Sequence, residues 1–352
     1  MRFFCALYLV LSASACVFMP GSARDLTDNH RPQSVEDYYK QGGYTVVDRE
    51  HLRDVSDCEV ERIRLNTASG EITLDYFRRP KPNDALVLVF PILGGRNQFA
   101  NYFAEYFAKR GFETAVVHRD GSFKNPDYFY ELEEVFRGNV IKDRIAMDFF
   151  EREHNKHRFG SFGISRGGIN VAITAGVDER LKYNVIAMGG QDLVNMFRDS
   201  AENGIDRFRQ RVMDKYNITE KEFFDFLTEN VRTDPKNLAM YIDAKDTLMI
   251  LSAFDRSVPI KYGMRLRETI GHPDTIFLAS GHYTSVAFTR YAPIIPPATP
   301  VGIFPMNYIE TEAMAFYERK LGKGMSVNHW PYRLIQLPFS LIGKLGELLF
   351  DH

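Results

Sequence analysis

Short apolar runs alternate with amphipathic helical patterns along most of this chain. Residues 59–65 and 71–77 alternate apolar and polar positions around a polar loop, which predicts an antiparallel hairpin. Residues 85–90 are an unbroken apolar run, as expected of a strand covered on both faces. Further strands are predicted at 113–117, 157–163, 183–188, 247–253 and 275–279. The pattern therefore predicts an α/β fold with a mostly parallel, twisted sheet of about eight strands and helices on both faces.

Helical patterns separate these strands. One is an aromatic stripe at helical spacing, expected to face the core and made of Phe99, Tyr102, Phe103, Tyr106 and Phe107. Residues 191–240 interrupt the alternation with a longer helical stretch, in which Thr219 and Glu222 have the spacing of a capping box. A last helix is predicted at 308–321, where it would close the fold.

The two ends of the chain differ from this body. In residues 1–23, Arg2 precedes an apolar run and then a helix breaker with small residues, which is the layout of a secretory signal peptide. A lipoprotein processing site at Cys16 and a retained anchor or buried helix are the alternatives. We therefore expect an exported protein, periplasmic or secreted, or one attached to a membrane as a lipoprotein.

The predicted organisation has three further parts. Residues 24–58 are a lead-in segment, 59–322 form the α/β domain with an insertion at about 191–240, and 323–352 are an apolar C-terminal extension. The extension is too short and too often interrupted by polar residues to span a bilayer. It either packs on the body or makes peripheral contact with a membrane interface.

The composition argues against several classes of function. The 352 residues carry 44 Lys and Arg against 46 Asp and Glu, so the net charge is −2 and we expect no nucleic acid partner. Three cysteines make neither a disulfide scaffold nor a cysteine zinc cluster. No metal or organic cofactor is implied by the sequence.

The strongest chemical signal follows the predicted strand 157–163, where the chain reads Gly163-Ile164-Ser165-Arg166-Gly167. This is a G-x-S-x-G pattern between a strand and an apolar helix. The flanking glycines permit a tight, strained turn that exposes the Ser165 hydroxyl at the carboxyl edge of the sheet. A glycine-rich turn with an incidental serine is the alternative interpretation.

A serine nucleophile needs a base, and a carboxylate that orients the base. With this turn the acid and then the histidine come later in the chain. Of the later histidines, only His282 directly follows a strand, so it is the candidate base; His272 precedes the same strand and should lie at the opposite edge. Asp255, in the loop after strand 247–253, is the candidate acid by the same argument. The alternatives are a histidine that stabilises its loop and a solvated or helix-capping aspartate.

These residues resemble the α/β-hydrolase superfamily over about residues 59–322. Ser165, Asp255 and His282 match its order of serine, acid and histidine, and Gly281-His282 after the last strand matches a shorter phrase of the family. The resemblance implies that 191–240 is a cap over the active site. Its aromatic side chains then either line an acyl or alcohol pocket or pack the cap onto the body. His118 and Arg119, with Asp120, end another strand, where they would contact substrate or order a loop by hydrogen bonds.

The resemblance also implies an oxyanion hole. The superfamily usually has an HGG-like segment after its third strand, whereas residues 91–95 here replace the histidine and the first glycine. We assign the backbone amides of Leu93 and Arg166 to this role.

The function implied is cleavage of a carboxylic ester through an acyl-enzyme, with a small-molecule or acyl substrate. A peptidase, thioesterase or acyltransferase on the same residues is the alternative, as is a binding protein of this fold without catalysis.

Overall fold

The computed structural model describes residues 16–22, 30–92, 97–119, 121–278, 280–291 and 307–322. The predicted leader before residue 16, Leu93, Asp120 and the extension 323–352 lie outside the described residues. The strands are β1 (Cys16–Met19), β2 (Tyr44–Val55), β3 (Cys58–Thr67), β4 (Gly70–Arg78), β5 (Ala85–Phe90), β6 (Thr114–Val117), β7 (Arg158–Ile164), β8 (Leu181–Ala187), β9 (Thr247–Ser252) and β10 (Asp274–Leu278). The main helices are α2 (Gln33–Tyr38), α3 (Asn97–Ala108), α4 (Leu132–His154), α5 (Arg166–Val177), α6 (Leu193–Asp199), α7 (Asn203–Tyr216), α8 (Glu220–Asn230), α9 (Pro235–Leu238), α10 (Ile260–Ile270) and α11 (Tyr308–Leu321).

All ten strands form one sheet in the order β1-β10-β9-β8-β7-β5-β6-β4-β3-β2. The strands from β10 to β6 in this order are parallel, whereas β4, β3 and β2 continue the sheet in antiparallel pairs and β1 closes the other edge antiparallel to β10. The predicted hairpin is confirmed as β3 and β4, which pair from Glu59 with Arg78 to Thr67 with Gly70.

The sheet is larger than the predicted eight strands because β1 and β2 are added at its edges. Strand β2 lies in the segment 24–58 that was expected to be a lead-in, so the sheet begins before residue 59. Its side chains are nearly all exposed or half-buried, so its sequence lacks the apolar alternation that marks a strand with one buried face. Strand β1 has four residues and lies within the predicted leader.

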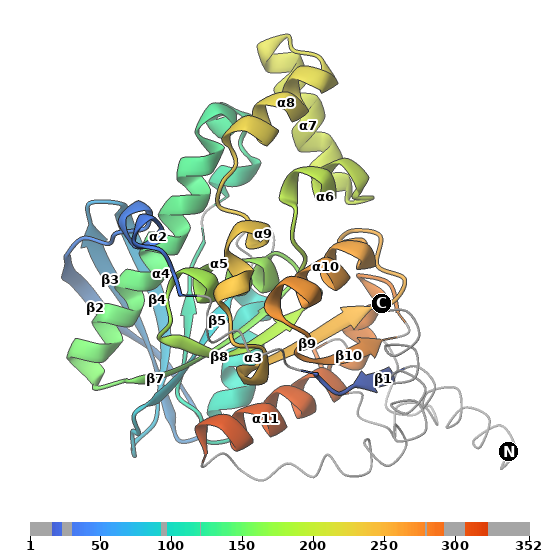
Figure 1. The fold of residues 1–352 in the computed structure, drawn as a ribbon. Helices are drawn as coiled ribbons and strands as arrows, with labels where there is room; N and C mark the ends of the chain where they lie inside the picture. The colour runs from blue at the N-terminus through green and yellow to red at the C-terminus, as the bar shows by residue number, and fades with distance from the viewer. Residues whose placement is uncertain are drawn as a thin grey trace, which may run out of the picture.

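Two layers of helices bury the two faces of the sheet (Figure 1). Strand β5 is apolar throughout because both of its faces are buried. Val87 and Val89 pack with α3 and α11 on one face, and Leu86 and Leu88 pack with α4, α5 and α10 on the other. The aromatic stripe of α3 is buried in the first of these cores, as predicted, through Phe99, Phe103, Tyr106 and Phe107, with Tyr102 half-buried against it.

Helices α6 to α9 lie between β8 and β9, and α7 and α8 stand above the rest of the molecule in Figure 1. The predicted capping box is present at the start of α8, where Thr219 and Glu222 bond each other's backbone amides. Phe208 and Phe223 are almost fully buried: Phe223 stacks on Phe129, and Phe208 packs against Phe223 and Phe123, so these aromatics hold the cap onto the body. Of the two roles considered for the cap aromatics, Phe208 and Phe223 have the packing role, whereas Phe197 of α6 lines the cavity described below.

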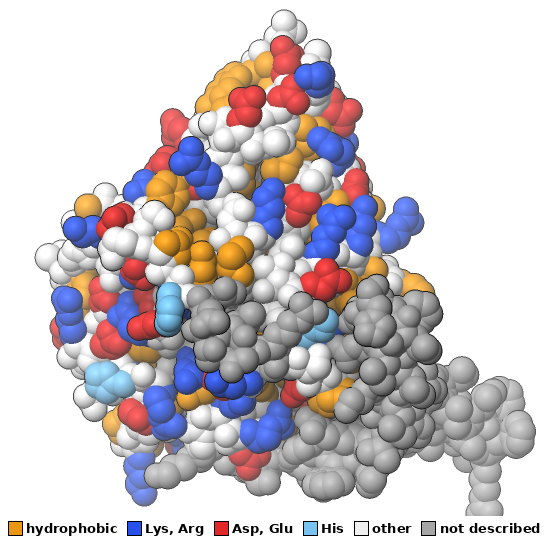
Figure 2. Space-filling model, viewed as in Figure 1, with side chains coloured by type: hydrophobic (Ala, Val, Ile, Leu, Met, Phe, Trp, Pro, Cys, Tyr) orange, Lys and Arg blue, Asp and Glu red, His pale blue; other side chains and the backbone are white. Residues whose placement is uncertain are grey.

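Side chains of both charges are interspersed on the face shown in Figure 2, and hydrophobic ones gather in separate patches, one of them on the cap. The near-zero net charge of the chain is therefore accompanied, on this face, by positive and negative side chains that lie next to one another. No helix in the described part of the chain has both the length and the apolar character needed to cross a bilayer.

Candidate functional site

Ser165 lies at the turn between β7 and α5 and has φ 58° and ψ −122°, a backbone conformation that a residue with a side chain rarely adopts. The turn is closed by close backbone contacts that only glycine permits. A Cβ at Gly163 would lie 2.3 Å from the carbonyl of Gly167, and one at Gly167 would lie 2.4 Å from the carbonyl oxygen of Phe90. The glycines of the motif therefore allow the strained turn that the sequence predicted.

The structure brings the three predicted side chains together from three strand ends. His282, which follows β10, has its Nε2 2.9 Å from the Ser165 Oγ and its Nδ1 2.7 Å from the Asp255 Oδ2. Asp255 follows β9. The carboxyl ends of β7, β9 and β10 lie at one edge of a parallel sheet, which is why residues far apart in sequence meet here.

Asp255 is held by its own loop. Its Oδ1 accepts hydrogen bonds from the backbone amides of Ser257, at 2.9 Å, and Val258, at 2.8 Å. The side chain is almost fully buried, so its other oxygen is left to face His282. His272, the histidine rejected by the strand argument, lies just before β10, 3.5 Å from an Arg267 nitrogen.

Arg166 is the first residue of α5. Its amide is one of the first four of the helix, which have no acceptor within the helix. That position, directly after Ser165, suits an oxyanion donor. The second predicted donor, Leu93, lies outside the described residues.

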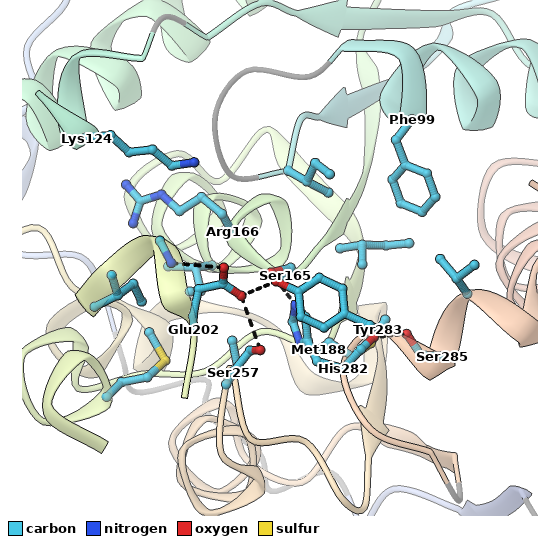
Figure 3. Close-up of a pocket in the computed structure, with 18 of the residues that line it drawn as sticks. Phe99, Lys124, Ser165, Arg166, Met188, Glu202, Ser257, His282, Tyr283 and Ser285 are labelled. Atoms are coloured by element: carbon cyan, nitrogen blue, oxygen red, sulfur yellow. Dashed lines mark hydrogen bonds between the residues drawn. The ribbon is translucent and has the colours of Figure 1, made fainter. Parts of the chain in front are cut away.

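A cavity of about 700 Å³ opens over Ser165 and His282 (Figure 3). Its walls are mainly apolar and come from the sheet edge, the cap and the loop after β10; the apolar members include Ile92, Phe99, Met188, Met196, Phe197, Ile205, Val258 and Val286. Such a cavity suits a small substrate with an apolar part.

Sequence reasoning missed Glu202, which caps α7 and lines the cavity. Its carboxylate accepts hydrogen bonds from the hydroxyls of Tyr283 and Ser257, so it joins the cap to the two loops that carry His282 and Asp255. Burial acts to raise the pKa of Glu202, but the bonds from Tyr283, the Gly204 amide and Ser257 outweigh it and lower that pKa. No motif marks this residue, because its role depends on where the cap folds.

His118 and Arg119, for which a substrate contact or a loop network was predicted, have protein partners. The Nε2 of His118 lies 2.9 Å from a carboxylate oxygen of Asp75, and Arg119 pairs with Asp143. Neither residue lines the cavity. In the described part of the chain, no group of three or more His, Cys, Asp or Glu side chains could hold a metal ion.

The chain matches no protein-family model and no curated protein sequence. Solved structures do resemble it. An acetyl xylan esterase from Paenibacillus sp. R4 superposes with a TM-score of 0.56 at 15% identity, over 73% of this chain and 93% of that one. Acetyl Xylan Esterase 1 from Thermoanaerobacterium sp. JW/SL YS485 gives a TM-score of 0.56 at 17% identity, over 83% and 96%.

A third structure is larger than this chain. The acylaminoacyl peptidase of Pyrococcus horikoshii has a TM-score of 0.55 at 15% identity, over 78% of this chain and 45% of its own length. At these sequence identities, the structural similarity shows only that the fold is shared. That fold is the one to which the order of the motifs already pointed, and the chain has the α/β-hydrolase fold, as its resemblance to that superfamily implied.

Proposed function

We propose that this protein is a serine hydrolase that cleaves a carboxylic ester through an acyl-enzyme intermediate. The observation that supports this most directly is the continuous chain of hydrogen bonds from Ser165 through His282 to Asp255. A serine hydroxyl is a weak nucleophile until a base accepts its proton, and a carboxylate keeps that base in the required tautomer.

In the first half-reaction the Ser165 Oγ attacks the ester carbonyl carbon while its proton passes to His282 Nε2. The carbonyl oxygen becomes an oxyanion, which the Arg166 amide stabilises; such a donor contributes about 3 kcal/mol. His282 then gives the proton to the departing alcohol oxygen as the carbon–oxygen bond breaks. The products of this half-reaction are a free alcohol and an ester between Ser165 and the acyl group.

In the second half-reaction water takes the place of the alcohol. His282 accepts a proton from the water as its oxygen attacks the acyl-enzyme, and then returns a proton to Ser165 Oγ as the acid leaves. Asp255 remains an acceptor from His282 Nδ1 throughout and stabilises the imidazolium that forms twice per cycle. The apolar walls of the cavity hold the acyl or alcohol part of the ester.

Ser165→Ala tests this function. Hydrolysis of a short p-nitrophenyl ester should fall by at least about 10³-fold, because the bond-forming atom is gone. The variant should unfold at the same urea concentration as the wild type, since among the described residues the only hydrogen-bond partner of the hydroxyl is His282.

A fluorophosphonate probe gives the matched readout. It should label the wild type and Ser257→Ala, whose serine lines the same cavity, but not Ser165→Ala. Labelling of the Ser165→Ala protein, or turnover like that of the wild type, would contradict the assignment of the nucleophile. A wild type that neither reacts with the probe nor cleaves any ester would favour the noncatalytic alternative.

A further inference from the structure

The side chain of Arg166 is a buried cation inside the cavity. The residue is only 9% exposed, and its guanidinium lies over the rings of Phe136, at 4.5 Å from the centroid, and Phe123, at 5.2 Å. Its Nη1 is buried without a hydrogen-bond partner, and among the described residues no carboxylate lies within ion-pair distance of it. Buried arginines normally have such a partner, because removing an unpaired charge from water is costly.

Among the described residues, the neighbouring charges compensate this cation only weakly. Burial lowers the pKa of Arg166 to about 10, and the positive charge of Arg119 acts in the same direction. Asp234 opposes them from a distance, but its carboxylate accepts hydrogen bonds from the backbone amides of Asp192, Leu193 and Lys236. Its two oxygens therefore already accept hydrogen bonds from the start of α9 and from the start of α6.

The cavity itself favours an anion near Arg166. Lys124 and Arg207 also line it, and Figure 3 shows the Arg166 side chain extending from the serine turn towards Lys124. Among the described residues, the one acidic side chain in the lining is Glu202, which is already bonded to Tyr283 and Ser257. The wall around Arg166 and Lys124 is thus the positive part of a mainly apolar cavity.

We propose that Arg166 binds a carboxylate on the substrate, so that the preferred substrates are esters whose acyl or alcohol part carries a negative charge. This rests on the proposed ester hydrolysis at Ser165. A guanidinium offers a planar fork of N–H donors that matches a carboxylate, and its position next to the nucleophile places the bound anion in the same cavity as the reacting bond. The apolar walls then hold the carbon chain between them.

Two matched pairs of esters test the proposal, one for each side of the ester bond. On the acyl side, p-nitrophenyl hydrogen adipate is compared with p-nitrophenyl hexanoate, which has the same chain length without the carboxylate. On the alcohol side, 4-acetoxybenzoate is compared with its methyl ester. The wild type should prefer the charged member of at least one pair, by kcat/KM corrected for uncatalysed hydrolysis.

The effect of Arg166→Gln is measured as a ratio within that pair: kcat/KM for the charged ester divided by kcat/KM for the neutral one. The ratio should fall by about 10- to 100-fold, the range expected for a hydrogen bond to a charged group. A ratio is used because any change at the neighbouring oxyanion amide affects both esters alike. Arg166→Lys keeps the charge but not the fork, and should give an intermediate ratio.

Arg198→Gln is the matched control. Arg198 lies on α6 with its guanidinium 4.5 Å from the Phe224 ring centroid, so it makes the same kind of contact outside the cavity, and both ratios should stay unchanged. A wild type that cleaves both members of each pair without preferring the charged one overturns this inference and leaves the hydrolase function standing, whether or not the Arg166 variants fold. An unchanged ratio in Arg166→Gln also overturns it. A wild type that cleaves none of the four esters and fails to react with fluorophosphonate defeats the proposed function itself.

Discussion

Ser165 combines a strained backbone with a hydroxyl that faces its base. Its φ of 58° is held in place by contacts of the neighbouring backbone, including a 2.9 Å hydrogen bond from its own amide to the carbonyl of Ala187. Because the amide points towards β8, the side chain is left at the sheet edge, 2.9 Å from His282. At the scale of single residues, strain and orientation are therefore two results of the same turn.

Asp255→Asn tests the orienting carboxylate. An asparagine still accepts the bonds from Ser257 and Val258 through its oxygen, but its amide then faces His282 and favours the wrong tautomer. Ester hydrolysis at neutral pH should fall by about 10³- to 10⁴-fold with little change in stability.

The measurement is kcat for a p-nitrophenyl ester, with Asp243→Asn as the control. Asp243 lies before β9, where it caps a short turn, and its substitution should change the rate by less than about twofold. Equal rates in Asp255→Asn and the wild type would remove Asp255 from the mechanism.

At the scale of elements, the G-x-S-x-G turn depends on how closely β7 approaches α5. Gly163 is the last but one residue of β7, and a Cβ added there would lie 2.3 Å from the backbone of Gly167 in the first turn of the helix. This contact sets the angle at which the helix leaves the strand. The direction of the Ser165 side chain follows from that angle.

Gly163→Ala should therefore destabilise the protein by more than about 3 kcal/mol, or prevent folding, since the added methyl would overlap backbone atoms that have no free space to move into. Gly138→Ala is the matched control, because Gly138 lies inside α4 with nothing within 4 Å of the new Cβ. There alanine should stabilise the helix by up to about 1 kcal/mol. Urea unfolding of both variants gives the comparison, and a Gly163→Ala protein as stable as the wild type would disprove the close-approach argument.

The carboxyl end of α4 carries a pH-dependent contribution to stability. His154, the last residue of the helix, packs its ring against Tyr76, Phe149 and Phe150. Burial, with the charges of Arg49 and Lys156, lowers the pKa of His154 to about 4. In the unfolded chain a histidine has a pKa of about 6.5. Between these values the unfolded state binds a proton that the folded state does not, so stability falls as the pH falls.

His154→Phe should remove this contribution while keeping an aromatic ring in the same contacts. The free energy of unfolding of the wild type should therefore drop more steeply between about pH 6.5 and 4 than that of the variant. Urea midpoints across this range measure the difference. Parallel curves would show that the ring of His154 gains its proton as easily in the folded protein as in the unfolded one.

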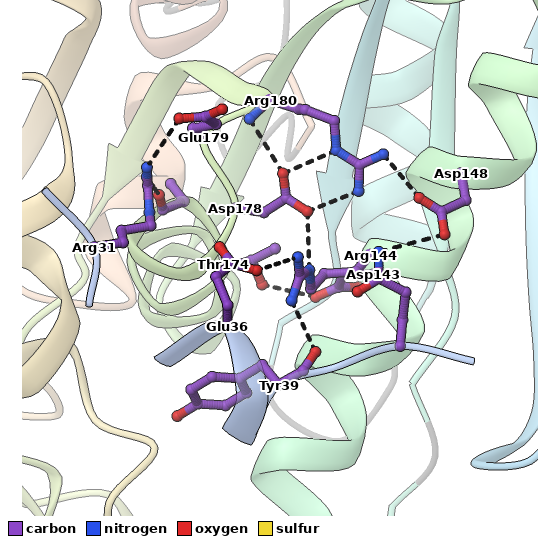
Figure 4. Close-up of polar contacts among 12 residues, drawn as sticks. Arg31, Glu36, Tyr39, Asp143, Arg144, Asp148, Thr174, Asp178, Glu179 and Arg180 are labelled. Atoms are coloured by element: carbon purple, nitrogen blue, oxygen red, sulfur yellow. Dashed lines mark hydrogen bonds and ion pairs between the residues drawn. The ribbon is translucent and has the colours of Figure 1, made fainter. Parts of the chain in front are cut away.

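At the scale of the whole molecule, an ionic network joins the N-terminal segment to α4 and to the end of α5 with the turn that follows it (Figure 4). Arg144 on α4 donates to Asp178, to Glu36 and to the carbonyl of Tyr39. Arg180 pairs with Asp178 from the other side, and burial of Asp178 is outweighed by these arginines, which lower its pKa. The network holds residues 31–39 against the body, since Arg31 also donates to the carbonyls at the end of α5.

Arg144→Met should cost about 3 kcal/mol of unfolding free energy, because the substitution removes the donor to the Tyr39 carbonyl and leaves the buried Asp178 carboxylate with one arginine partner instead of two. Arg137→Met is the control on the same helix. Arg137 also donates to a carbonyl of the N-terminal segment, that of Tyr38, but its side chain is 30% exposed and its loss should cost less than about 1 kcal/mol. Urea unfolding decides this, and equal costs in the two variants would contradict the role given to burial.

The sequence by itself predicted the fold class and the three residues that meet at the candidate site. Unbroken apolar runs such as 85–90 mark strands buried on both faces, because such strands have no polar face to show. Once the strands are known, Ser165, Asp255 and His282 follow from their places at strand ends, since parallel strands end at the same edge. Strand burial and position at a strand end depend on neighbouring residues in the sequence, so the local pattern of apolar and polar residues predicts them.

The tertiary structure decided what depends on contacts between distant segments. Strand β2 is mainly polar and is a strand only because β3 offers it an edge. Glu202 reaches Tyr283 across 81 residues of sequence, through a cap whose position no periodicity reveals. The burial of Arg166 depends likewise on Phe123 and Phe136, which come from other elements. The sequence pattern around a residue predicts which face of its element it occupies. Its partners are set by how the elements pack together, and these partners in turn determine the charge of the cavity.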